Sequence, residues 1–321
     1  MRVARIPVPG RTRIRRTLAE QALVPLAARR ARADVLHNLQ STAPAVRGAR
    51  AMVTTVLDLL YLRHPDTHSA LLARGMGVLV PMAARRSDRL IAISQATKDD
   101  LTGSLDVPAD KVDVVHLGPG LADDVVPAAE VDLRARLGLG ERPILLSPSA
   151  RRAHKNLDRL LDAFARACPA GEAVLVLPGY ATGAEDELAA RARRLGIADQ
   201  VVFTGWLPDA DLAGLYACAT ALVFPSLAEG FGLPVLEAMR AGLPVACADR
   251  TSLPEIAGGA ALLFDPESVD SIAGAIRALL DDPALRARLV GLGRARAAAF
   301  SWERTARETL AVYERALRSA R

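Results

Sequence analysis

The chain has 321 residues, of which 51% are hydrophobic, 24% charged and 4% aromatic, and its formal net charge is +5. This length indicates two domains, or one large domain, with sizeable cores. The sparse aromatic residues offer no obvious base-stacking platform. Among 41 basic residues only Lys98, Lys111 and Lys155 are lysines, a bias typical of a GC-rich genome, so we expect no nucleic-acid partner.

No apolar run approaches the ~20 residues that span a bilayer, and the first residues, rich in proline and arginine, contain no signal-peptide core. The cysteines, Cys168, Cys218 and Cys247, are scattered in apolar surroundings, which favours reduced thiols over disulfides or a metal site. We therefore expect a cytoplasmic protein. Peripheral membrane contact stays open, because the basic stretch Arg11–Arg32 contains interspersed apolar residues. The irregular apolar stripe, which Pro25 interrupts, favours a solvated basic helix.

The first half alternates short apolar strands with helical stretches, which indicates a parallel α/β domain. The predicted strands are Asp34–His37, Met52–Val56, Leu90–Ser94 and Val112–His116, and the helices are Arg16–Ala31, Ser69–Arg86 and Lys98–Leu105. A break over 118–127 precedes a short helix, Val131–Leu137. We place the first domain at residues 1–138.

A second α/β unit, residues 139–300, follows. Its predicted strands are Pro143–Ser147, Ala173–Leu177, Val201–Phe203, Ala221–Phe224 and Pro244–Ala248. The segment Asn156–Cys168 has apolar residues at helical spacing. Residues 301–321 form a terminal helix, with Ser301 as N-cap and Glu303 in the first turn.

The segment Glu229–Glu237 reads Glu-Gly-Phe-Gly-Leu-Pro-Val-Leu-Glu and follows a buried strand. Pro234 suits the first turn of a helix, where its missing N–H costs nothing, and we place Glu237 in that first turn. Gly230 and Gly232 allow a ligand to approach the backbone, and the free N–H groups of a helix start suit an anionic ligand. Taken alone, each glutamate is better explained structurally, Glu229 as a solvated loop acid and Glu237 as a helix-dipole partner.

The segment Ser149–Leu157 contains Arg151, Arg152 and Lys155 between a strand and a helix. A helix start beside cationic side chains is a phosphate site in many α/β proteins. A solvated basic helix start is the alternative.

The long segment Ser226–Asp265 resembles the donor-site signature of family 4 glycosyltransferases. It contains the two-glutamate motif, the turn and strand Ala-Gly-Leu-Pro-Val, and Leu-Pro-Glu-Ile-Ala. The resemblance extends over the first half through 34–37, 54–65 and 87–118. It implies the GT-B fold, in which two Rossmann-like parallel-sheet domains face a cleft and the terminal helix crosses back to the first domain.

The resemblance also implies roles for particular residues. Glu229 holds the donor sugar and stabilises the transition state, without acting as a nucleophile, and Glu237 holds the ribose hydroxyls. Lys155 binds the diphosphate, and Arg151 is the arginine that we assign beside it, because Ala150 and Ser149 occupy the family's usual arginine positions. The remaining assignments are Gly230, Phe231, Gly232 and Leu233 at the sugar, and Gly205 near the base, where Trp206 is open to interpretation as a core residue. No metal or other cofactor is implied.

Two features depart from the family pattern. The family's His-Asp pair reads Leu57-Asp58 here, which removes a histidine that lies against the donor sugar and leaves Asp58 at the cleft. The usual opening strand, Gly-rich loop and helix also lack a match, and Met1–Pro9 resembles the edge strand that follows them. Because such a unit takes about 30 residues, we expect an incomplete first domain and either an upstream start or a truncated gene.

The sequence predicts a glycosyltransferase that moves a hexose, with retention, from a nucleoside diphosphate sugar to a glycan, glycolipid or other acceptor. The alternative from another class is a degenerate, non-catalytic nucleotide-sugar-binding protein, which Leu57 and the missing opening favour. A GT-B epimerase or phosphorylase is a third possibility, against which the two-glutamate motif argues.

Overall fold

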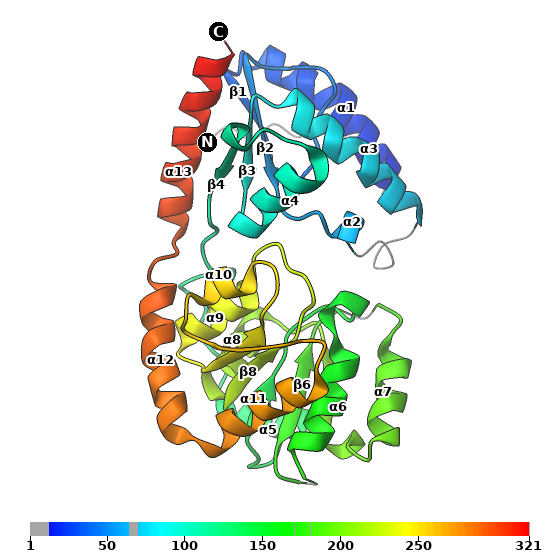
Figure 1. Cartoon of the computed structure of the whole chain (residues 1–321), viewed down its shortest axis with the longest axis vertical. Coiled ribbons are helices and arrows are strands. Elements are labelled where there is room, and N and C mark those ends of the chain that lie inside the picture. Colours follow the sequence, from blue (N-terminus) through cyan, green and yellow to red (C-terminus); the bar gives the residue numbers. More distant parts are fainter. Residues whose placement is uncertain (1–12, 64–69, 170, 181, 321) are drawn as a thin grey trace. The chain divides into compact units, whose positions relative to one another are not determined.

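The computed structural model of the chain describes residues 13–63, 70–169, 171–180 and 182–320. The chain divides into two compact units, Met1–Leu117 with Trp302–Arg321, and Gly118–Ser301 (Figure 1). Residues 118–138, which we assigned to the first domain, thus belong to the second unit. The reason is packing: Leu133 is fully buried, and its side chain lies against Gly214.

The described part of the first unit contains a four-stranded parallel sheet in the order β1-β2-β3-β4. Its elements are α1 (Arg13–Arg30), β1 (Val35–Asn38), β2 (Ala51–Val56), α2 (Leu60–Arg63), α3 (Ala70–Arg86), β3 (Arg89–Ala92), α4 (Gln95–Leu105), β4 (Val112–Val114) and α13 (Trp302–Ser319). The proposed edge strand Met1–Pro9 lies outside the described residues.

The C-terminal helix α13 completes the core of the first unit. Its buried residues Val312 and Ala316 pack on Ala51 and Val53 of β2 and on Ile91 of β3. A separate cluster, formed by α3, α4 and residues of β2 and β3, includes Val80, Leu90 and Leu101. All six residues of β2 are buried, as expected for the interior of a parallel sheet, and the hydroxyls of Thr54 and Thr55 are hydrogen-bonded to Ser87 and His37.

A partly buried hydrogen-bond chain also ties α13 to the sheet. His37 of β1 places Nδ1 2.7 Å from the Tyr313 hydroxyl and Nε2 2.7 Å from the Thr55 hydroxyl. Burial lowers the pKa of His37 to about 4, so the ring is neutral at physiological pH. Each ring nitrogen is therefore occupied by a hydroxyl from a different element.

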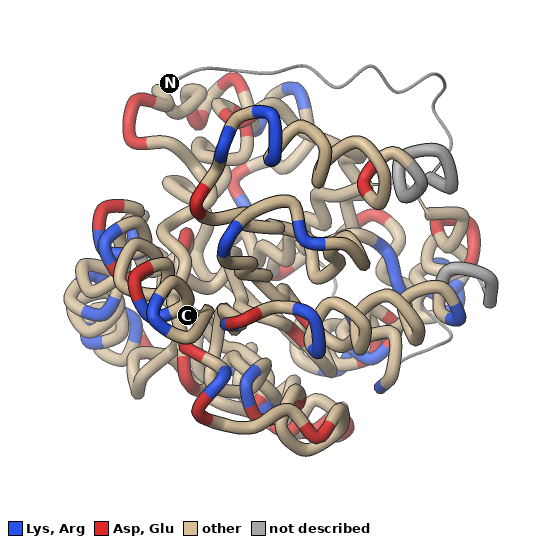
Figure 2. Tube along the Cα trace, turned by 90° about the horizontal axis from the view of Figure 1, so that it is seen from above, with Lys and Arg blue, Asp and Glu red and all other residues tan. Residues whose placement is uncertain are grey.

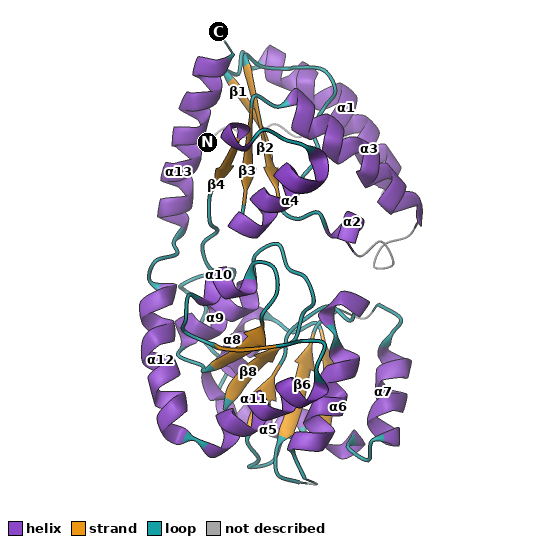
Figure 3. Ribbon diagram, viewed as in Figure 1, coloured by secondary structure: helices purple, strands orange, loops and turns teal. Residues whose placement is uncertain are grey.

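The second unit contains, within the described residues, a six-stranded parallel sheet in the order β10-β9-β8-β5-β6-β7. Figure 3 shows helices and strands of this unit in different colours. Its elements are α5 (Glu130–Leu137), β5 (Ile144–Leu146), α6 (Leu157–Ala167), β6 (Val174–Pro178), α7 (Glu185–Arg194), β7 (Val201–Gly205), α8 (Asp209–Cys218), β8 (Ala221–Phe224), α9 (Leu233–Ala241), β9 (Val245–Ala248), α10 (Leu253–Ala257), β10 (Leu262–Phe264), α11 (Val269–Asp281) and α12 (Pro283–Ala297).

The strand order reverses direction between β5 and β8. From β5 the chain advances through α6 to β6, whereas from β8 it advances the opposite way through α9 to β9. Right-handed crossovers therefore place α6 and α9 on opposite faces of the sheet. The loops that follow β5 and β8 therefore run in opposite directions away from each other. Open parallel sheets bind their ligands at such a reversal of strand order.

The predicted strands agree with the observed ones to within two residues at each end, and β2, β5, β6, β8 and β9 are buried at every position. The prediction missed β10, whose three residues give too short a pattern.

Lys and Arg are interspersed with Asp and Glu along the helices (Figure 2). Within the described residues, no helix combines the length and the apolar character that a membrane span requires.

Candidate functional site

Lys155 and Glu229 meet at the point where the strand order reverses. Lys155 ends a short 3-10 turn, Ala153–Lys155, after β5, and Glu229 lies in the loop between β8 and α9. The Lys155 Nζ donates to Glu229 Oε1 at 2.5 Å, and both side chains are largely buried, with exposed fractions of 16% and 12%. The structure thus brings together the two residues predicted to bind phosphate and sugar.

The loop that carries Lys155 is fixed by its neighbour. Asn156 adopts a left-handed conformation with φ of 59° and is buried. Its amide Nδ2 donates to the carbonyls of Pro225, at 3.1 Å, and Pro266, at 2.7 Å. These bonds hold the β5–α6 loop against the segments that follow β8 and β10, so the position of Lys155 is determined by three strands.

The loop that carries Glu229 is held by the residues after β9. The backbone N–H of Glu229 donates to the Thr251 hydroxyl at 3.0 Å, and the Ser252 hydroxyl donates to the carbonyls of Glu229 and Phe231. The Phe231 ring is buried and meets Phe300 edge to face, with centroids 6.0 Å apart. Phe231 therefore offers its backbone, and not its ring, to a ligand.

Helix α9 begins at Leu233 with Gly232 as its N-cap at φ of 114°, a conformation that favours glycine. Pro234 takes the second position, where no backbone N–H is needed. Glu237 is the fifth residue of the helix and lies one turn beyond its start, so our placement of Glu237 in the first turn was wrong. The early start reflects Gly232, whose left-handed backbone lets the helix begin before the proline.

Glu237 is a mostly buried carboxylate. The Tyr216 hydroxyl of α8 donates to its Oε2 at 2.8 Å. Burial raises the pKa of Glu237, and hydrogen bonds from Tyr216 and from the backbone of Leu121 and Gly120, together with the charge of Arg240, oppose that rise. Glu237, Tyr216 and Arg240 border a cavity of about 300 Å³ whose other walls are apolar, formed by residues such as Val125 and Ala213.

Arg151 is buried within its loop. Its guanidinium pairs with Glu185 at the start of α7 at 3.1 Å and lies over the Phe203 ring, 5.3 Å from the centroid. The carboxylate of Glu185 also accepts from the backbone N–H groups of Thr182 and Gly183, which helps to hold its pKa at about 2. Arg151 is therefore engaged by α7 and β7 in this structure.

The predicted base-proximal residue, Gly205, ends β7 with φ of 72°. Its carbonyl accepts from the backbone N–H of Gly179 at 2.9 Å, which joins the ends of β6 and β7. Trp206 is not a core residue, because 63% of its surface is exposed. Its ring stacks on Tyr180 with centroids 4.4 Å apart, so a pair of exposed aromatic rings marks this corner of the sheet.

Asp58 lies in the first unit, just before α2, where its carboxylate accepts from the backbone N–H of Leu60 at 3.0 Å. Leu57, which stands where the family has histidine, is 37% exposed, and its backbone N–H donates to the Ser41 hydroxyl. Both backbones are thus fixed at the end of β2.

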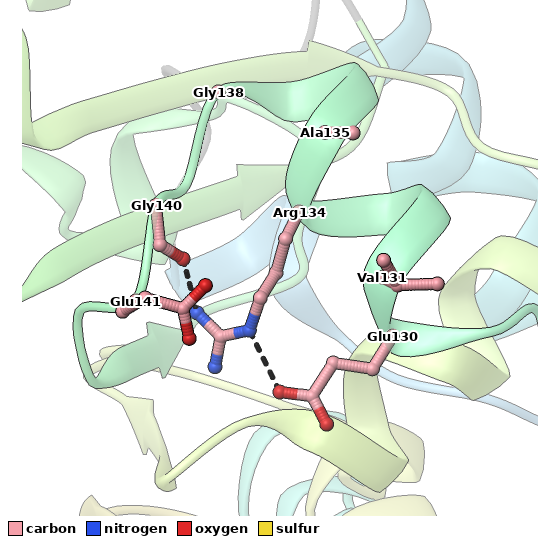
Figure 4. A pocket seen from close by; sticks show the side chains of 7 residues that line it. All are labelled: Glu130, Val131, Arg134, Ala135, Gly138, Gly140 and Glu141. Carbon is pink, nitrogen blue, oxygen red and sulfur yellow. Dashed lines mark hydrogen bonds and ion pairs between the residues drawn. The ribbon is translucent and has the colours of Figure 1, made fainter.

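A larger hollow of about 760 Å³ lies along α5 (Figure 4). Arg134 in this hollow donates to Glu130 and to the Gly140 carbonyl, both at 2.7 Å, so its cation is already engaged (Figure 4). The lining of this hollow contains none of the predicted site residues, and we place the site at the ends of β5 and β8.

Among the described residues, no group of three or more His, Cys, Asp or Glu side chains is arranged to hold a metal ion.

Two family models match the chain. One, Glycosyl transferases group 1, covers residues 131–296, and the other, Glycosyltransferase Family 4, covers residues 1–119. The chain belongs to the glycosyl transferases group 1 family. The first match contains both glutamates, Lys155 and the strands that position them, and it confirms the predicted class, a glycosyltransferase.

Similar proteins support this assignment. The chain is 31% identical over 271 residues to O-antigen chain mannosyltransferase B of Escherichia coli, covering 82% of this chain and 70% of that protein. It is 35% identical over 243 residues to the MMP alpha-(1->4)-mannosyltransferase of Mycolicibacterium hassiacum, covering 73% of this chain but only 56% of that protein. The chain therefore spans less than two thirds of the second relative.

The fold agrees with that of solved glycosyltransferase structures. The structure of sucrose-phosphate synthase from Thermosynechococcus elongatus matches with a TM-score of 0.76 at 22% identity, covering 96% of this chain and 81% of that one. This likeness and the two parallel sheets confirm the GT-B fold.

Proposed function

We propose that the chain transfers a hexose from a nucleoside diphosphate sugar to a glycan or lipid-linked acceptor, with retention at the anomeric carbon. The observation that carries this proposal is the pairing of Lys155 with Glu229 at 2.5 Å beside the start of α9. A cation, a carboxylate and the positive end of a helix converge there, at the place where parallel sheets bind nucleotides.

The parts of the donor are assigned along this edge. Lys155 and the N-terminus of α9 neutralise the diphosphate, and Glu229 with the backbone of 230–233 holds the sugar. Glu237 accepts hydrogen bonds from the ribose hydroxyls, since one carboxylate can accept from two donors. Gly205 lies near the base. Arg151 contributes to the phosphate site only if its guanidinium turns away from Glu185.

In the reaction, the bond from the anomeric carbon to the phosphate oxygen breaks and a bond to the acceptor oxygen forms on the same face. The acceptor's proton passes to the leaving phosphate. Stabilisation of the departing diphosphate by Lys155 lowers the barrier, because its negative charge grows as the bond breaks. Glu229 stabilises the positive charge that develops on the sugar, without forming a bond to it.

Mannose is the first sugar to test, because two relatives above 30% identity are named mannosyltransferases. The acceptor is proposed only as a glycan or glycolipid. We further propose that the protein works in the cytoplasm, with peripheral membrane contact as an open feature, and that donor binding needs no metal.

Calorimetric titration with UDP, GDP, ADP and TDP, each with and without Mg²⁺, tests the donor site. Binding that selects one base and is unchanged by Mg²⁺ supports the proposal and identifies the nucleotide sugar to use in a transfer assay. A folded sample that binds none of the four nucleotides would contradict it. Binding that appears only with Mg²⁺ would refute metal independence alone.

A further inference from the structure

Tyr216 donates a hydrogen bond to Glu237, and the proposed donor site gives Tyr216 no role. Tyr216 is 2% exposed, and its hydroxyl lies 2.8 Å from Glu237 Oε2. Burial and the nearby carboxylate raise the pKa of Tyr216 well above its usual range. The phenol therefore stays protonated at any working pH, and the hydrogen bond runs from Tyr216 to the carboxylate.

The second oxygen of Glu237 has a different neighbour. A Cβ added at Gly120 would lie 2.3 Å from Oε1, so the backbone of Gly120 passes directly over this atom. The backbone of Gly120 and Leu121 also hydrogen-bonds to the carboxylate. The two carboxylate oxygens thus have different neighbours. The Tyr216 side chain of α8 contacts Oε2, and the backbone of Gly120, near the start of the second unit, lies against Oε1.

We propose that Tyr216 is a positioning residue that fixes the Glu237 carboxylate for recognition of a ribose diol. This inference rests on the proposed function, in which Glu237 holds the ribose. A glutamate side chain has several rotatable bonds, so a free carboxylate takes many orientations. It binds a vicinal diol well only when both carboxylate oxygens are held facing the two hydroxyls. Tyr216 supplies that restraint and offsets part of the cost of burying the charge.

A purely structural role for Tyr216 is the competing explanation, because its ring is also fully enclosed by the core. The two roles differ in what they do to ribose recognition. Loss of packing weakens binding of every nucleotide alike, whereas loss of positioning weakens only the contribution of the 2′- and 3′-hydroxyls.

The test compares GDP and UDP with their 2′,3′-dideoxy counterparts by calorimetry, in the wild type, Tyr216→Phe and Glu237→Gln. Wild type should prefer the ribose form by about tenfold or more, the value of one charge-assisted hydrogen bond. Tyr216→Phe should reduce this preference to within about threefold while leaving affinity for the dideoxy forms unchanged. Glu237→Gln should reduce it similarly.

A matched control exists in the first unit. Tyr61 is also buried, and its hydroxyl has no hydrogen-bond partner among the described residues. Tyr61→Phe removes a buried hydroxyl without touching Glu237, and it should keep the wild-type preference for ribose.

A pH series gives a second readout. Ribose preference requires ionised Glu237 and is lost as pH falls through its pKa. The Tyr216 hydrogen bond lowers that pKa, so the small preference that remains in Tyr216→Phe should be lost at a higher pH than the wild-type preference.

The outcomes separate the two proposals. A ribose preference in Tyr216→Phe as large as that of the wild type overturns the positioning role while the donor site stands. Equal weakening of ribose and dideoxy forms assigns Tyr216 to packing and also overturns it. A wild type that binds neither form refutes the proposed function and the inference with it.

Discussion

The Lys155 ammonium donates to the Glu229 carboxylate at 2.5 Å, although 74 positions separate the two residues in the sequence. Each group is mostly shielded from water, so each compensates the charge of the other. In the proposed donor site, we expect the diphosphate to draw Lys155 away from Glu229 and so to free the carboxylate to face the sugar. On this proposal, the pair would link phosphate binding to preparation of the sugar site.

Replacing Lys155 with alanine should weaken binding of a nucleoside diphosphate by roughly ten- to a hundred-fold, the value of a charge-assisted hydrogen bond. Binding of the corresponding nucleoside should change little, because it carries no phosphate. Calorimetry on both ligands measures the difference. Lys98→Ala, which removes a lysine bonded to the Val112 carbonyl in the first unit, is the matched control. Equal losses for nucleotide and nucleoside would disprove the phosphate role of Lys155.

Glu229→Gln should leave nucleoside diphosphate affinity unchanged or higher, because Lys155 no longer has a competing carboxylate. Transfer should fall by at least about a hundredfold, since the developing charge on the sugar loses its partner. Product formation under saturating donor, together with calorimetry, separates the two effects. Full turnover in this variant would remove Glu229 from the active site.

Gly179→Ala should disturb the loop after β5. A Cβ at Gly179 would lie 1.8 Å from the Ser149 carbonyl oxygen, and the residue has φ of 154°. We expect a loss of about 1–3 kcal/mol in the free energy of unfolding, measured in urea, and weaker nucleotide binding because Lys155 follows in the same loop.

Gly274→Ala is the control for this change, because nothing lies within 4 Å of its added Cβ. It should stabilise α11 by about 0.5–1 kcal/mol through helix propensity. If Gly179→Ala proves as stable as Gly274→Ala, the close approach to Ser149 is not a constraint.

The titration of His37 should make the free energy of unfolding depend on pH. Its pKa is about 4 in the folded protein against 6.5 for the free side chain, so the unfolded chain binds more protons between these values. The stabilising contribution is complete above pH 6.5 and is lost as pH falls towards 4, by about 2 kcal/mol after allowance for its partial exposure to water.

Urea unfolding of the wild type and His37→Gln at pH 7 and pH 4.5 isolates this contribution. Glutamine can still reach Tyr313 or Thr55 but does not titrate. The stability difference between the two proteins should therefore shrink or reverse at the lower pH. An unchanged difference would show that His37 is protonated in the folded state.

The sequence could identify the second sheet and the donor segment because their information is local. The apolar runs of β5, β6, β8 and β9 are buried on both faces, and Glu229–Glu237 is a contiguous motif. The pairing of Lys155 with Glu229 could be anticipated only through the resemblance, since spacing along the chain says nothing about which loops adjoin.

The remaining site features depend on packing between distant segments. Arg151 points to Glu185, and Tyr216 reaches Glu237 from another helix, neither of which leaves a periodic signal. The one available hint was Tyr216 itself, a large polar residue in the otherwise small and apolar stretch of α8. Residues 118–138 were misassigned because a Pro- and Gly-rich break marks a loop without showing on which unit the next helix packs.

The packing of α13 on β2 and β3 has a consequence for synthesis on the ribosome. The second unit is one continuous segment and can close its core as soon as Ser301 has emerged. The first unit, although its strands are made earlier, must wait for Val312 and Ala316 to cover Ala51 and Val53. The order of translation is thus the reverse of the order in which the two cores can be completed, and a nascent chain has one apolar sheet face that awaits its last helix.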